Sequence, residues 1–141
     1  MKTLRASVVA VLLCTACASH HATPQDRLTA DLQELQQAVT INVGDGQRAA
    51  RLKSSIDELG EQLRAFVAAS DSFQSSFLRL NARPDATRAQ FTSLIDGFDK
   101  QRAAIRARVF QLHSEMIAAT TEKEWKSLAY YERKLLTDPG T

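Results

Sequence analysis

The sequence predicts an all-α protein: a long antiparallel helical hairpin with two shorter flanking helices, forming a partial four-helix bundle. Three observations lead to this prediction. Apolar residues recur at alternating steps of four and three, the spacing of one face of a helix. Proline and glycine mark most of the boundaries between these stretches. The two longest stretches match in length and are joined by a short turn, as in a helical hairpin.

The first helix is expected to begin at Thr23-Pro24, because threonine is a favoured N-cap residue and proline fits the first helical position. Gly44 and Gly46 should end it, since each glycine costs a continuing helix about 1 kcal/mol relative to alanine. The apolar face of this helix consists of Leu28, Leu32, Leu35 and Val39.

Two long helices are expected over about 47–80 and 85–119, with Pro84 in the turn between them. Each carries a seven-residue apolar repeat, interrupted by Ser70 in one helix and Arg102 in the other. Such repeats predict coiled-coil-like packing of the two helices. The repeat positions are Leu52, Ile56, Leu59, Leu63, Phe66, Phe73, Phe77 and Leu80, then Phe91, Ile95, Phe98, Ile105, Val109, Leu112 and Met116. Gly60 is expected to fall off the apolar stripe.

A fourth helix is predicted after Thr121, because Thr121 and Glu124 have the spacing of a capping box. Its apolar residues are Trp125, Leu128, Tyr131 and Leu135. The turn-forming residues 138–140 end it. Residues 24–137 are therefore expected to form a single helical domain.

The two short helices join the hairpin at the same end and are about half as long as its arms. They should therefore complete a four-helix bundle at that end and leave a two-helix arm at the other. We expect Phe110 to lie in the bundle. The phenylalanines in or bordering the arm are predicted to bind a protein partner or a second copy, because two helices seal only the seam between them. They are Phe66, Phe73, Phe77, Phe91 and Phe98. Alternatively they are ordinary core residues, covered by the short helices or by a bend at Gly97.

Residues 1–16 are predicted to be a secretory signal peptide and residues 17–23 a polar tether. The basic start is followed by an apolar stretch over 6–13, which is far shorter than the ~20 residues that span a membrane. Residues 13–17 resemble a bacterial lipobox, with Cys14 where leucine is usual, and predict lipidation of Cys17. Ala18 after it favours the outer membrane, by resemblance to lipoprotein sorting. The alternative is ordinary cleavage after residues 16–18, which would release a soluble periplasmic chain.

Charge and cysteine content exclude several classes of protein. The chain has 18 Lys and Arg against 16 Asp and Glu. Because Lys2 and Arg5 lie in the signal peptide, the exported chain should be neutral, and its mixed charges argue against nucleic-acid binding. Cys14 and Cys17 are the only cysteines. Since both belong to the signal and lipidation region, neither a redox pair nor a disulfide is expected.

No constellation of residues indicates an enzyme, a cofactor or a metal centre. The sequence contains neither the zinc motif H-E-x-x-H, nor a glycine-rich phosphate loop, nor G-x-S-x-G. His20 and His21 lie in the tether, and weak metal binding there or at His113 is the less favoured alternative. We expect His113 to be a hydrogen-bonded residue flanking the core. Arg102 should lay its stem over the core and send its charged end outward, with Glu61 on the facing helix as the candidate partner for an ion pair.

Segments 91–96, 103–108 and 120–125 resemble the Spy/CpxP-like periplasmic proteins, which include chaperone-like and metal-responsive members. The motif of that family, L-T-x-x-Q, is altered in both places where it would fall, at 28–32 and at 120–124. The resemblance implies a binding or chaperone-like role and transfers no site residues. The alternative function is that of a structural or assembly lipoprotein in a fixed envelope complex.

Overall fold

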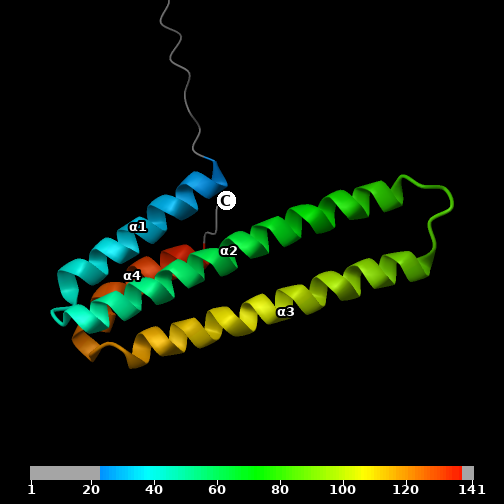
Figure 1. The fold of residues 1–141 in the computed structure, drawn as a ribbon. Helices are drawn as coiled ribbons and strands as arrows, with labels where there is room; N and C mark the ends of the chain where they lie inside the picture. The colour runs from blue at the N-terminus through cyan, green and yellow to red at the C-terminus, as the bar shows by residue number, and fades with distance from the viewer. Residues whose placement is uncertain (1–22, 138–141) are drawn as a thin grey trace, which may run out of the picture.

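The computed structural model describes residues 23–137, and within that range the chain forms four α-helices and no strand (Figure 1). These are α1 (Pro24–Asn42), α2 (Gly46–Asn81), α3 (Arg88–Ala118) and α4 (Glu122–Thr137). The predicted all-α fold is confirmed. The signal peptide 1–16, Cys17, His20, His21 and the turn at 138–140 lie outside the described residues. No helix in the described range is long and apolar enough to cross a membrane.

Each helix begins at a side-chain cap. Thr23 and Asp26 form a capping box at α1, and Thr121 and Glu124 form the one predicted before α4. The predicted start of α3 at residue 85 is wrong, because the helix begins at Arg88. A further capping box fixes this start: the Gln90 backbone N–H donates to Thr87 Oγ1, and Gln90 Oε1 accepts from the Thr87 N–H at 2.9 Å.

The short helices cover one half of the hairpin. In Figure 1, α1 and α4 lie along the end of the hairpin where α2 begins and α3 ends, while the other half extends alone. Helix α1 packs on α2 and on α4, and α2 packs on α3 along the hairpin. All four helices contribute to one core, whose largest fully buried side chains are Leu35, Val39, Leu52, Ile56, Leu59, Leu112, Met116, Leu128 and Leu135. The partial bundle with a two-helix arm is therefore what the chain forms.

Gly60 falls off the apolar repeat that faces α3, and it is buried where α1 crosses α2. A methyl group built on Gly60 would lie 2.7 Å from Leu32 Cδ1, far inside a normal contact. The missing side chain therefore allows the two helices to approach closely. Gly97 differs, because a methyl group there would meet nothing within 4 Å and α3 continues through it without interruption.

Ion pairs fasten the helices of the bundle to one another. Arg48 at the start of α2 binds both carboxylate oxygens of Glu124, at 2.8 and 3.0 Å, and donates to the Ala119 carbonyl. Glu124 therefore caps α4 and ties it to α2 at once. This lowers the pKa of Glu124 to about 2, mainly through the hydrogen bond from Arg48 and then through the Thr121 backbone N–H. At the other end of α4, Lys134 contacts Asp31 of α1 at 2.6 Å.

Alanine substitutions at the two glycines should have different effects on stability. Gly97→Ala should raise the free energy of unfolding by about 0.5–1 kcal/mol, because alanine favours the helix and the added methyl meets open space. Gly60→Ala should give a smaller gain or a loss, because the buried Leu32 side chain must move. Urea unfolding of both variants checks this, and equal gains would contradict the close approach of α1 at Gly60.

Glu124→Gln should destabilise the protein at neutral pH but not in strong acid. A carboxylate whose pKa is lowered by folding from 4.5 to about 2 stabilises the fold above pH 4.5, and this contribution is lost as the pH falls toward 2. Glutamine can still serve the capping box, so the change reports mainly the charge. Unfolding curves of wild type and variant should therefore converge between about pH 4.5 and 2. A gap that persists at pH 2 would contradict this assignment.

Candidate protein-binding surface

Aromatic side chains form the seam of the arm. Phe73 of α2 stacks on Phe98 of α3 with ring centroids 4.5 Å apart. Phe77 lies 6.0 Å from Phe73 and meets Phe91 edge-on at 5.5 Å. Phe66, two turns before Phe73 on the same stripe, is half-buried. Four of the five predicted phenylalanines are thus brought together as one row, and Phe66 lies further along the same stripe; each ring is only partly removed from water.

Three large apolar side chains of the arm remain open to solvent. Phe77 is 36% exposed, Ile95 42% and Leu78 60%. We call these three residues the apolar arm surface. Ile95 was predicted to be a seam residue, yet it is the most exposed member of its repeat. Leu78 lies off the repeat, so the apolar periodicity gave no reason to select it.

Leu78 and Ile95 lie on the faces of α2 and α3 that the short helices cover in the bundle half of the hairpin. Leu78 is 11 residues, about three turns, from Val67, so both lie on the same face of α2. Val67 and Leu28 of α1 line one small cavity near the start of α1. Ile95 is 18 residues, about five turns, from His113, which contacts α4. Neither α1 nor α4 extends along the outer half of the arm (Figure 1). The apolar arm surface is therefore the uncovered continuation of the side on which α1 and α4 pack.

Arg102 and Phe110 complete the account of the predicted residues on α3. Arg102 sends its guanidinium outward, as expected, but its acidic contact is Asp99 on its own helix, at 3.0 Å, rather than Glu61. It also lies 5.8 Å from the centroid of the Phe98 ring. Phe110 lies in the bundle half of α3, as predicted, but its ring is 64% exposed rather than part of the core. It neighbours the buried stripe of α3 without belonging to it.

His113 holds the most buried charged residue of the described chain. Its Nδ1 lies 2.7 Å from Oε1 of Glu132, whose side chain is buried on α4, and its ring meets Trp125 edge-on. The predicted hydrogen-bonded role of His113 is confirmed. Glu132 was missed, although its spacing of four residues from Leu128 places it on the apolar face of α4. Within residues 23–137 no group of three or more His, Cys, Asp or Glu is arranged to hold a metal ion.

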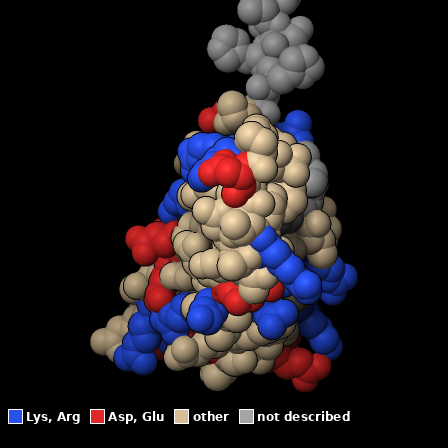
Figure 2. All heavy atoms as spheres, turned by 90° about the vertical axis from the view of Figure 1, so that its right-hand side faces the viewer, with Lys and Arg blue, Asp and Glu red and all other residues tan. Residues whose placement is uncertain are grey.

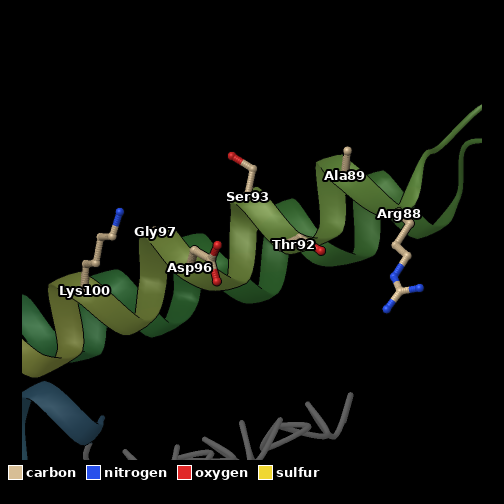
Figure 3. A pocket seen from close by; sticks show the side chains of 7 residues that line it. All are labelled: Arg88, Ala89, Thr92, Ser93, Asp96, Gly97 and Lys100. Carbon is tan, nitrogen blue, oxygen red and sulfur yellow. The ribbon is translucent and has the colours of Figure 1, made fainter.

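The outer surface of α3 offers a hollow that a single helix lines (Figure 3). Its residues are Arg88, Ala89, Thr92, Ser93, Asp96, Gly97 and Lys100. Because no second helix of the described chain contributes to it, the hollow is open and does not enclose a ligand. Figure 2 views the molecule from the end of the arm and shows basic and acidic side chains interspersed, without a continuous patch of either sign. The arm surfaces are therefore distinguished by their apolar and small residues rather than by net charge.

No protein-family model, no curated protein and no solved structure matches the chain. The resemblance to the Spy/CpxP-like proteins stays a prediction, and no family is assigned.

Proposed function

We propose that this protein is a periplasm-facing envelope lipoprotein, without enzymatic activity, that binds other proteins in a chaperone-like manner. The observation that carries the proposal is the apolar arm surface, which is left open because α1 and α4 cover only half of the hairpin. Burying an apolar side chain of this size is worth roughly 1.5–3 kcal/mol, so three exposed ones on the arm favour contact with an apolar partner.

The construction of the arm suits reversible binding of apolar segments. The stacked rings beneath the surface give it a fixed base, while Leu78 and Ile95 stand at its two edges on different helices. Arg102 and Asp99 border the surface with one charge of each sign, so they select neither acidic nor basic partners. Such a surface recognises exposed apolar side chains rather than a particular sequence, as expected for a binder of unfolded proteins.

The envelope location is proposed from residues 1–17. The basic and apolar start followed by the lipobox-like segment supports export, lipidation of Cys17 and anchoring to the outer membrane. A soluble periplasmic form follows if cleavage occurs at residues 16–18 instead.

Leu78→Ser combined with Ile95→Ser should reduce binding of apolar clients with little effect on folding. Both side chains are largely exposed, so the melting temperature should change only slightly. The measurement is light scattering from several unrelated, chemically unfolded proteins, whose aggregation the full chain should suppress and the variant should suppress at most half as well. Ile41→Ser is the matched control, because Ile41 is 74% exposed but lies on α1 in the bundle.

Equal suppression by the variant and by wild type would contradict client binding through the apolar arm surface. Co-purification of a single protein at a fixed ratio, without protection of unrelated proteins, would instead support the structural or assembly role.

Mass spectrometry of the mature N-terminus tests the proposed anchor. Wild type purified from membranes should begin at Cys17 and carry acyl chains, whereas Cys17→Ser should leave the membrane fraction. An unmodified chain that begins at Ser19 would contradict lipidation and support the soluble form.

A further inference from the structure

We propose that the hairpin pairs with a second copy of this chain through α2, in antiparallel orientation, on the face of α2 opposite α1. The inference deepens the proposed function in that it assigns a partner to another side of the same arm. It does not require that clients bind, because the apolar arm surface lies on the side of α1 and α4.

A groove runs along this second face of the arm. On the α2 side it is lined by Ser72, Ser76 and the buried Ala69, and on the α3 side by Ser93, Leu94, Gly97 and Gln101. The groove is open to solvent, and the stacked rings Phe73 and Phe98 also line it. It continues toward the tip of the arm along Arg79 and Arg83. The small side chains Ser72 and Ser76 leave room for another helix to approach α2 closely.

The residues of α2 on this face follow a second seven-residue repeat, distinct from the apolar repeat of the seam. Within α2, steps of four and three connect positions 58, 62, 65, 69, 72, 76 and 79. The middle of the repeat is small, with Ala65, Ala69, Ser72 and Ser76. Its two ends are polar and differ in character: one carries Glu58 and Gln62, and the other carries Arg79.

The repeat is complementary to itself when it is reversed. In an antiparallel pair centred between residues 70 and 71, Ala69 falls opposite Ser72 of a second copy and Ala65 opposite Ser76. The same register brings Arg79 opposite Gln62 and its neighbour Glu61. The contact from residue 62 to residue 79 would span about 26 Å at 1.5 Å per residue. Each favourable pair occurs twice, because a twofold interface repeats every contact.

One charge pair is available in this register. Arg83 does not contribute, because it lies beyond the end of α2 and binds Asp85, and Glu58 already binds Arg108 across the hairpin. Arg79 hydrogen-bonds only to the Ser76 hydroxyl, at 3.1 Å, among its contacts within residues 23–137. It is therefore positioned to pair with a carboxylate from outside the chain. Glu61 is exposed and lies one residue before the repeat position Gln62. It is the carboxylate that an antiparallel second copy places opposite Arg79.

Reversing one charge at the proposed contact should weaken the dimer, and reversing both charges should restore it. Arg79→Glu faces Glu61 of the second copy, and Glu61→Arg faces Arg79, so each should raise the dissociation constant at least about tenfold by placing like charges together twice. The double variant exchanges the two charges and should return the dissociation constant close to that of wild type. Sedimentation of the full chain over a range of concentrations measures these constants.

Two further variants make the outcome specific. Arg133→Glu is the matched control, because it makes the same charge change at an exposed position of α4, outside the arm, and should leave the dimer intact. Ser72→Gln adds bulk near the proposed twofold axis at an exposed position and should weaken pairing without lowering the melting temperature.

A wild-type chain that sediments as a monomer at every concentration would overturn the proposal. So would a double variant no better than the single ones, or Arg133→Glu weakening the dimer as much as Arg79→Glu. Because the readout is the mass of the assembly, failure here is distinct from failure of client protection, which light scattering reports.

Discussion

The unequal lengths of the helices constrain everything else in this molecule. Helices α2 and α3 have 36 and 31 residues, while α1 and α4 have only 19 and 16. At 1.5 Å per residue, α1 covers about 28 Å of an α2 that is about 54 Å long. A closed apolar core therefore exists at one end of the hairpin only. At the other end the same two helices must be held together by what they bury between themselves.

The composition of the seam reflects this difference. In the bundle the buried positions of α2 are aliphatic, from Leu52 to Leu63, because neighbouring helices enclose them on several sides. In the arm the seam becomes aromatic. Large flat rings such as Phe73 and Phe98 bury much area at each position and gain further from stacking, which a two-helix contact needs. Rings of that size extend beyond the seam, so partly exposed aromatic edges are a consequence of the architecture.

The sequence predicted those features that depend on local spacing. The apolar repeats located all four helices, and Thr121 with Glu124 located the start of α4. Thr87 and Gln90 carry an equally local signal, which the nearby Pro84 obscured. Features that depend on distant residues were not accessible: burial of Gly60 requires Leu32 of α1, 28 positions away. Phe110 illustrates a further limit, because it neighbours the apolar stripe in sequence yet points away from the core.

The same dependence on residues distant in sequence explains why the sequence predicted the row of phenylalanines but not the apolar arm surface as a whole. Periodicity identifies the residues that line the seam, but it cannot say which side of the seam stays open. That is decided by where α1 and α4 end, which leaves Leu78 and Ile95 without cover. A residue such as Phe73 is then primarily a support, and an exposed neighbour is the better candidate for contact with a partner.

The two faces of the arm also differ in what they can accept. The side of α1 and α4 presents large apolar groups, Phe77, Leu78 and Ile95, which bind by removing area from water and tolerate many partners. The opposite side presents Ser72, Ser76 and Gly97, whose small size adds little apolar area but lets a helix approach along a defined register. A surface whose binding free energy comes from close helix packing favours one fixed partner. A surface whose binding free energy comes from buried apolar area accepts different partners. Because these faces lie on opposite sides of the same helices, pairing through one leaves the other open, and a paired hairpin would present two apolar arm surfaces in place of one.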